Sequence, residues 1–159
     1  MLARGRALLG FAQLITGDRH QAEDIVQEVL ARTHLRWARV SRMEAPEAYV
    51  RKAITREYLS WRRRRASSER VLADVPDRPL HGDLAASTVD RDRMWRLLAG
   101  LPPTQRAVLV LRFYCDLPDE QIADVLGRAR STVRAEASRA MARLRTMIAS
   151  DAAQEALHG

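Results

Sequence analysis

The sequence has few of the residues that build sheets, disulfide frameworks or membrane spans. Its 159 residues include 7 glycines, 6 prolines and one cysteine, Cys115. A single cysteine excludes a disulfide within the chain and any zinc site made of several cysteines. No apolar run approaches the roughly 20 residues that span a bilayer, and the start lacks the charged-then-apolar pattern of a signal peptide. We therefore expect a cytoplasmic protein without membrane insertion.

Lysine is also scarce, because Lys52 is the only one among 27 basic residues. The net charge of +7 and the pI near 10.8 favour an anionic partner. The distribution of the charge is more informative than its total. Residues 51–65 hold seven basic residues against one acid, and residues 128–145 hold six arginines against one acid.

Sparse glycine, proline and β-branched runs argue against a sheet, and the apolar residues recur at helical spacing nearly throughout. The sequence predicts an all-α fold of two small helical domains joined by a flexible linker. The domains are residues 1–65 and 92–149, with a frayed tail at 150–159. Their predicted helices span 4–16, 19–39, 46–65, 93–99 and 103–114, followed by a helix-turn-helix. The predicted core includes Leu8, Phe11, Ala12, Ile15, Ala22, Ile25 or Val26, Val29, Trp37, Val50, Ala53, Ile54, Trp61, Met94, Leu97, Leu98, Val108, Leu109, Leu111 and Phe113.

The segment between the domains, residues 66–91, differs in composition from both of them. It contains Pro76, Pro79 and Gly82, and its acids outnumber its bases. This composition is typical of a linker.

Residues 117–144 have the pattern of two short helices joined by a tight turn. Asp119 is the predicted cap of the first helix, Gly127 ends it, and Ser131 or Thr132 caps the second. The first helix would bury Ile122, Val125 and Leu126, and the second Val133, Ala137, Ala140 or Met141, and Leu144. A hairpin of this kind also occurs in proteins that bind no DNA, but its arginines favour a helix-turn-helix that reads duplex DNA. The outward face comprises Arg130, Ser131, Thr132, Arg134, Ala135, Ser138 and Arg139.

The predicted helix 46–65 mixes basic and aromatic side chains. Cations that follow the backbone and rings that stack on unpaired bases are what single-stranded nucleic acid requires. Trp61 lies on the apolar stripe, so a core position and a stacking position both remain open for it. Tyr58 is offset from the stripe and is the better stacking candidate. The candidate DNA-binding residues of this helix are Arg51, Lys52, Arg56, Tyr58, Trp61 and Arg62.

An acidic and amide patch is predicted on an otherwise basic protein. Asp24, Gln27 and Glu28 share one helix face with Ala31, at helical spacing. By itself, this pattern is typical of a solvated helix face.

The sequence offers little for an enzyme. His20, His34, His81 and His158 show no ligand spacing, and neither a Gly-rich phosphate loop nor a nucleophile motif is present. We expect no catalytic residues, no metal and no cofactor.

Three stretches, LITGDRHQAEDIVQEVL (14–30), AYVRKAI with YLSWRRRR (48–65) and the segment 98–145, together resemble the extracytoplasmic-function (ECF) sigma factors of bacterial RNA polymerase, of the sigma-70 family and the actinobacterial type. The resemblance implies that residues 1–65 are region 2, which melts and reads the minus-10 promoter box. It implies that residues 92–149 are region 4, which reads the minus-35 box.

The same resemblance implies roles for individual residues and partners. Asp24, Gln27 and Glu28 would dock on a coiled coil of the polymerase β′ subunit, and the loop 38–46 would hold a flipped base. Polymerase core (β′ and β subunits) and promoter DNA are the implied partners, and an anti-sigma factor is a further candidate. The main prediction is thus a sigma factor that binds core polymerase and directs promoter-specific initiation. The alternative is a stand-alone helix-turn-helix regulator that binds duplex DNA through residues 117–144.

Overall fold

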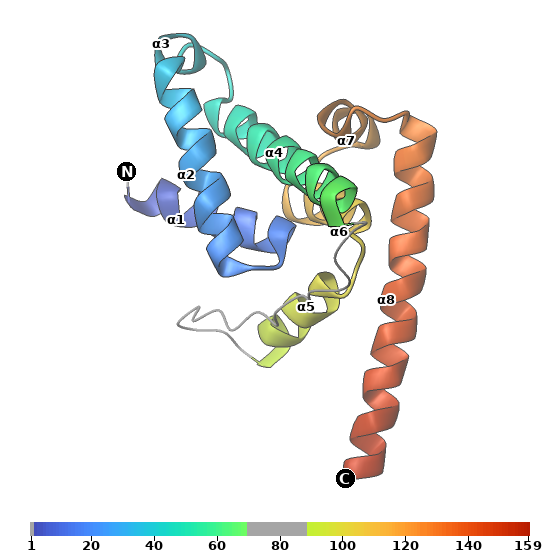
Figure 1. The fold of residues 1–159 in the computed structure, drawn as a ribbon. Coiled ribbons are helices and arrows are strands. Elements are labelled where there is room, and N and C mark those ends of the chain that lie inside the picture. The colour runs from blue at the N-terminus through green and yellow to red at the C-terminus, as the bar shows by residue number, and fades with distance from the viewer. Residues whose placement is uncertain (1, 70–88) are drawn as a thin grey trace. The chain divides into compact units, whose positions relative to one another are not determined.

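A computed structural model describes residues 2–69 and 89–159 of the chain. It is helical in both ranges and contains no strand within them, which confirms the predicted all-α class (Figure 1). The chain divides into two compact units, residues 1–82 and 83–159. Most of the predicted linker, residues 70–88, lies outside the described residues.

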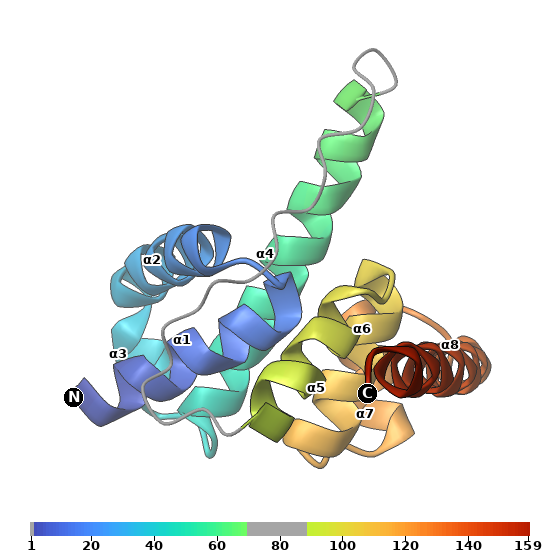
Figure 2. The same cartoon turned by 90° about the horizontal axis from the view of Figure 1, so that it is seen from below.

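The described part of the first unit, residues 2–69, contains three long helices and one short one. They are α1 (Leu2–Thr16), α2 (Arg19–Leu35), α3 (Trp37–Val40) and α4 (Pro46–Glu69). Helix α1 packs against both α2 and α4, and α2 packs against α4 (Figure 2). As predicted, Leu8, Phe11 and Ile15 of α1 are buried with residues of the other two helices. Three mutually packed helices therefore share one core.

The turn between α1 and α2 follows the predicted chemistry. Gly17 has φ of 70°, and the Asp18 carboxylate caps α2 by accepting a hydrogen bond from the Gln21 amide at 3.0 Å. The side chain satisfies one of the amides that a helix start leaves without a partner.

The predicted helix 19–39 is confirmed over residues 19–35 and is wrong only at its C-terminal end. Helix α2 ends at Leu35, where Arg36 leaves the helical region with ψ of 15°, and the chain restarts as α3. This break shifts the helical phase, so Val40 reaches the core and Trp37 does not. Trp37 is 49% exposed rather than buried.

The second unit contains α5 (Val89–Ala99), α6 (Pro103–Leu109), the π-helix η1 (Val110–Tyr114), α7 (Asp119–Leu126) and α8 (Arg130–His158). Helix α8 packs against α5, α6 and α7. Its residues Ala140, Met141, Leu144 and Met147 lie against Leu98, Leu101 and Leu109 in one cluster. The long helix α8 therefore contacts the three other α-helices described in this unit.

Three helices, α4, α5 and α8, extend beyond their predicted ends. Helix α4 continues to Glu69 and α5 begins at Val89, so both ends of the predicted linker are helical. No glycine or proline interrupts residues 62–69 or 89–99, so nothing in the sequence stops these helices. The predicted fraying after Ser150 is also wrong, because α8 continues to His158.

Two predicted core residues of the second unit face solvent. Met94 is 52% exposed and Phe113 is 63% exposed. Phe113 lies in η1, where the Cys115 amide donates to the carbonyl of Val110, five residues back. The wider turn changes the helical phase, so Leu111 stays buried while Phe113 and Tyr114 turn outward.

The turn between α7 and α8 has the predicted glycine conformation. Gly127 has φ of 62° and ψ of 37°, and the Arg128 amide donates to the Ala123 carbonyl at 3.0 Å in the Schellman pattern. Helix α8 begins without the expected side-chain cap from Ser131 or Thr132, because it starts at Arg130 after Ala129.

We predict that Gly127→Ala lowers the free energy of unfolding by about 1 kcal/mol, since an added Cβ is strained in the left-handed region. Beyond Gly127 itself and its two chain neighbours, no atom lies within 4 Å of the Cβ position, so backbone strain is the expected cause of the loss. Thermal unfolding measures it. The matched control is Gly10→Ala inside α1, also with open space at Cβ, which should raise stability. Equal effects of the two substitutions would contradict the prediction.

Candidate nucleic-acid and partner interfaces

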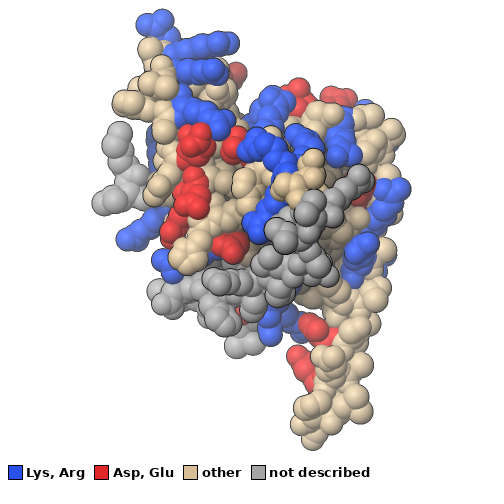
Figure 3. Space-filling view, in the orientation of Figure 1, with Lys and Arg blue, Asp and Glu red and all other residues tan. Residues whose placement is uncertain are grey.

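Helix α2 presents the predicted acidic patch to solvent. Asp24, Gln27 and Glu28 are all exposed, while Ile25, Val26 and Val29 of the same helix are buried. Figure 3 shows acidic side chains gathered along α2. The amphipathic spacing therefore sets one face toward the core and leaves these three residues together on the other.

An ion-pair network ties this patch to α4. Arg32 pairs with Glu28 at 2.8 Å and with Glu57 at 3.0 Å, and Arg64 pairs with Glu57 at 3.3 Å. The hydrogen bonds from Arg32 to Glu28 and Glu57 raise the pKa of that guanidinium. Glu57 therefore lies between two arginines rather than facing solvent alone.

A groove of about 490 Å³ lies between α2 and α4 beside the acidic patch. Trp61 lines this groove together with Asp24, Glu28 and Glu57. The Arg65 guanidinium lies over the Trp61 ring, 5.0 Å from its centroid. The structure thus places Trp61 in a groove lined by several carboxylates, with one cation of α4, Arg65, over its ring.

The prediction that Tyr58 offers its ring to unpaired bases is wrong. Tyr58 is 1% exposed, and its hydroxyl donates to the Thr16 carbonyl at 3.4 Å. Helix α4 packs against two helices, α1 and α2. Its buried arc is therefore wider than the apolar stripe predicts, and it includes Tyr58.

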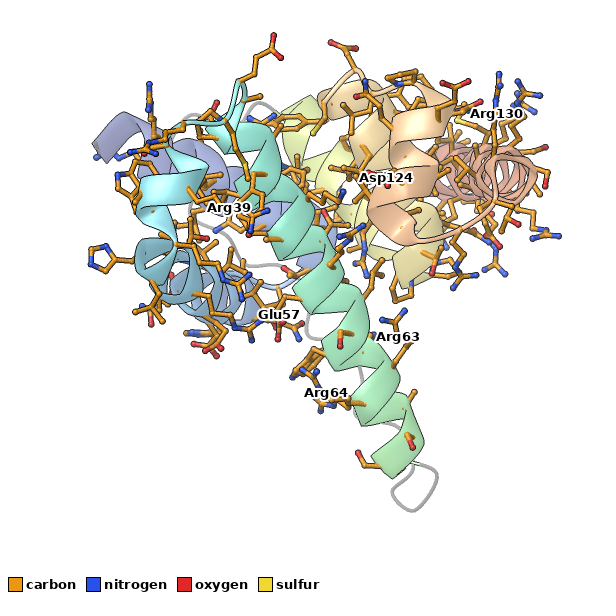
Figure 4. The ribbon with its side chains drawn as sticks, turned by 90° about the horizontal axis from the view of Figure 1, so that it is seen from above. Arg39, Glu57, Arg63, Arg64, Asp124 and Arg130 are labelled. Atoms are coloured by element: carbon orange, nitrogen blue, oxygen red, sulfur yellow. The ribbon has the colours of Figure 1, made fainter. Side chains whose placement is uncertain are left out.

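The cations of α4 divide between different sides of the helix. Figure 4 shows Glu57 and Arg64 on one side and Arg63 on the opposite side. Lys52 and Arg56 share the face of Arg63 by helical spacing. Arg51 instead lies over the Phe11 ring of α1, 5.5 Å from its centroid. The basic face formed by Lys52, Arg56 and Arg63 is thus separate from the acidic groove.

Trp37 is an exposed aromatic that the sequence pattern missed. It begins the short α3, beside the exposed residues Arg36, Arg39 and Arg42. The apolar spacing placed Trp37 in the core, and no residue type marked the break at Arg36. This α3 corner, formed by Trp37 with Arg36, Arg39 and Arg42, combines an exposed ring with cations. The sequence predicts that combination for helix 46–65 instead.

The first part of α8 presents the predicted recognition face. Val133, Ala137 and Ala140 are buried, as predicted, which turns the opposite side outward. Figure 4 shows Arg130 at the beginning of α8. Of the seven predicted residues, Arg130, Ser131, Arg134, Ser138 and Arg139 are exposed, whereas Thr132 and Ala135 are half-buried.

Each arginine of this face pairs with a carboxylate. Arg130 pairs with Glu120 at 3.2 Å, Arg134 with Asp119 at 3.3 Å, and Arg139 with Glu136 at 3.0 Å.

Asp119 does not cap α7 as predicted, since Pro118 precedes the helix and Asp119 is its first residue. Its carboxylate accepts hydrogen bonds from Arg112 and Arg134 instead. These two arginines, Arg112 first, lower the pKa of Asp119.

Within residues 2–69 and 89–159, no group of three or more His, Cys, Asp or Glu residues is arranged to hold a metal ion. In the same ranges, no helix has both the length and the apolarity that crossing a bilayer requires. His81 lies outside the described residues.

Comparison with protein families matches both units. The family model described as Sigma-70 region 2 matches residues 2–68, and the one described as Sigma-70, region 4 matches residues 91–144.

Two relatives and one solved structure extend this similarity. The RNA polymerase sigma-E factor of Streptomyces coelicolor is 34% identical over 142 residues, covering 89% of this chain and 80% of that protein. The ECF RNA polymerase sigma factor ShbA of Streptomyces griseus is 33% identical over 84% of this chain and 75% of its own. The sigma factor RpoE of Bartonella quintana, solved with the anti-sigma factor NepR, has a similar fold. Its TM-score is 0.72 at 24% identity over 94% of each chain.

A stand-alone regulator requires only the helix-turn-helix and leaves the match of the first unit unexplained. The chain belongs to the sigma-70 family and, within it, to the ECF sigma factors of bacterial RNA polymerase.

Proposed function

We propose that promoter-directed initiation depends on three surfaces, two on the first unit and one on the second. As a sigma factor, the chain binds core RNA polymerase and directs promoter-specific transcription initiation. In this proposal, the acidic patch of α2 docks on polymerase, α4 with the α3 corner reads the minus-10 box, and α8 reads the minus-35 box. The observation that carries it is that the first unit has an acidic face and a separate basic face, and that the second unit has a basic face of its own.

The docking surface consists of Asp24, Gln27 and Glu28. Their exposure presents two carboxylates and an amide to a cationic partner surface, and we propose, as the resemblance implies, that this partner is the β′ coiled coil. Arg32 holds Glu28 at 2.8 Å, which orients its carboxylate before docking. A preoriented side chain loses less conformational freedom on binding. The β subunit is the second core contact that we propose, without assigning residues to it.

The proposed minus-10 surface combines cations of α4 with Trp37 of α3. Arg51, Lys52, Arg56 and Arg62 stay in the proposed set, and Arg63 joins them because it shares the face of Lys52 and Arg56. Glu57 does not oppose the DNA here, since Arg32 and Arg64 both pair with it. Tyr58 leaves the set because it is buried, and Trp61 belongs with the acidic groove.

Trp37 supplies the exposed ring that the minus-10 surface requires. We predict that Trp37→Ala weakens opening of the promoter by about 1–3 kcal/mol, the usual loss for one stacked base. Permanganate reactivity of unpaired thymines, measured with holoenzyme on a mapped promoter, reports this opening. The control is Trp61→Phe, which keeps a ring in the groove and should leave opening unchanged. Undiminished reactivity with Trp37→Ala would remove this residue from the proposal.

The minus-35 surface is the recognition face of α8, comprising Arg130, Ser131, Thr132, Arg134, Ala135, Ser138 and Arg139. Helices that enter the major groove read base edges with residues near their N-terminal end. These residues occupy the first three turns of α8, directly after the tight turn at Gly127.

We further propose that the chain performs no catalysis of its own and works in the cytoplasm, where polymerase and promoter DNA are found. An anti-sigma factor is a candidate regulator, because the structurally similar RpoE was solved with one.

Footprinting of the same fragment with and without core polymerase tests this proposal. We expect holoenzyme to protect an upstream duplex segment and to open a separate downstream segment. The stand-alone regulator predicts instead that the chain alone shifts duplex DNA, and that this affinity survives deletion of residues 1–65. A strong footprint by the chain without polymerase, confined to one site, would contradict the proposal.

A further inference from the structure

Asp119 joins two arginines from different elements of the second unit. Its Oδ1 accepts a hydrogen bond from Nη2 of Arg112 in η1, and its Oδ2 accepts one from Nε of Arg134 in α8, at 3.3 Å. The Asp119 side chain is 19% exposed, whereas that of Arg134 is 60% exposed. A mostly enclosed carboxylate therefore supports an exposed arginine of the recognition face.

Asp119 binds Arg134 through Nε, the one guanidinium nitrogen that is not terminal. A guanidinium carries five N–H donors in a rigid fork, four of them on the two terminal nitrogens. Within the described parts of the chain, the side chain of Arg134 makes this bond through Nε alone. Its two terminal nitrogens remain available for a two-point contact with guanine or phosphate.

The other two pairs of the recognition face are arranged differently. Glu120, which pairs with Arg130, has a side chain that is 77% exposed. Exposed pairs of this kind contribute little. Glu136 and Arg139 are three residues apart on α8 itself, so their bond ties the helix to nothing else. The pair of Asp119 and Arg134 alone among the three connects α8 to a carboxylate held by a further arginine.

We propose that Asp119 is a positioning residue that orients Arg134 to read a base of the upstream box. This inference rests on the proposed role of the α8 recognition face. Arg112 also binds the Asp119 carboxylate. Its charge therefore offsets that of Asp119 when Arg134 contacts DNA, which limits repulsion between Asp119 and the DNA phosphates. Arg112 and Arg134 also lower the pKa of Asp119, which favours its charged form.

The test measures base preference rather than affinity alone. The full chain is assembled with bacterial core polymerase and mixed with a pool of duplexes randomised over both boxes, and the bound fraction is sequenced. Arg134→Ala identifies the positions that Arg134 reads. At those positions, we expect Asp119→Ala and Asp119→Asn to reduce enrichment of the preferred base about fivefold, the lower end of the effect of a good bidentate contact. Binding to the unselected pool should not fall, since each variant removes a negative charge.

Matched variants separate positioning from a structural role. Glu120→Ala removes the same charge one residue further along and should leave the preference at these positions unchanged. The double variant Asp119→Ala with Arg134→Ala should be no worse than Arg134→Ala, because both act through one side chain. Asp119→Asn keeps the side-chain shape and serves as the test if Asp119→Ala lowers the melting temperature.

Three results would overturn the inference. If Arg134→Ala flattens the preference and the Asp119 variants do not, the positioning role is wrong while the recognition face stands. If both Asp119 variants weaken binding to all duplexes alike, the role of Asp119 is structural. If Arg134→Ala itself leaves every preference intact, the recognition face is wrong and the inference fails with it.

Discussion

Asp24→Ala combined with Glu28→Ala should reduce run-off transcription by holoenzyme to background. Both carboxylates are exposed on the face of α2 that we assign to polymerase docking. Truncating one partner of a charge pair that becomes buried on binding costs about 2–5 kcal/mol. At the lower value, two such losses weaken assembly with the core by roughly a thousandfold. The measurement is transcript yield from a mapped promoter at limiting concentration of the chain.

The control for this double variant removes two exposed carboxylates elsewhere. Asp92→Ala with Glu155→Ala makes the same charge change in the second unit, at exposed residues that belong to none of the proposed surfaces, and should transcribe normally. Raising the concentration of the Asp24 and Glu28 variant should restore part of the yield, because the defect is in binding. Normal transcription by that variant at limiting concentration would remove the patch from the docking surface.

Arg134→Ala and Arg139→Ala should each weaken binding of holoenzyme to the upstream box. If each arginine contacts one phosphate, the slope of log affinity against log salt should fall by about 0.9 for each residue removed. If it contacts a base instead, the loss should be about 1–3 kcal/mol and should appear at one position of the box. Titration with salt, repeated on duplexes changed at single positions, distinguishes the two cases.

Arg145→Ala provides the matched control on the same helix. Arg145 is exposed and lies on the side of Arg134, but about 16 Å further along α8 at 1.5 Å per residue. We expect both its salt slope and its base preference to match those of the unchanged chain. An unaltered upstream footprint with both Arg134→Ala and Arg139→Ala would show that another surface reads this box.

Helical spacing predicted the fold well where the helices are regular. Ile15 and Ile54 are buried as expected, and Gly127 ends α7 in the left-handed conformation. The failures occur where the helical phase changes. The break at Arg36 and the π-turn of η1 each turn a predicted core aromatic, Trp37 or Phe113, toward solvent.

The sequence predicted which residues of a candidate site share a helix face, but not which residues of different helices form ion pairs. Spacing within one helix placed Asp24 with Glu28, and Arg130 with Arg134. It could not predict the pair of Arg32 with Glu57, which are 25 residues apart, or that of Arg134 with Asp119, which are 15 apart. These pairs depend on how helices pack against one another, and a single-helix pattern carries no information about that packing.

Gel filtration of the purified chain with bacterial core polymerase that lacks its own sigma factor tests the central claim most directly. We predict that the chain co-elutes with the core, and that the Asp24→Ala and Glu28→Ala variant elutes separately at the same concentration. If the purified chain, free of any bound inhibitor, elutes apart from the core at concentrations where another sigma factor binds, our account of this protein is contradicted.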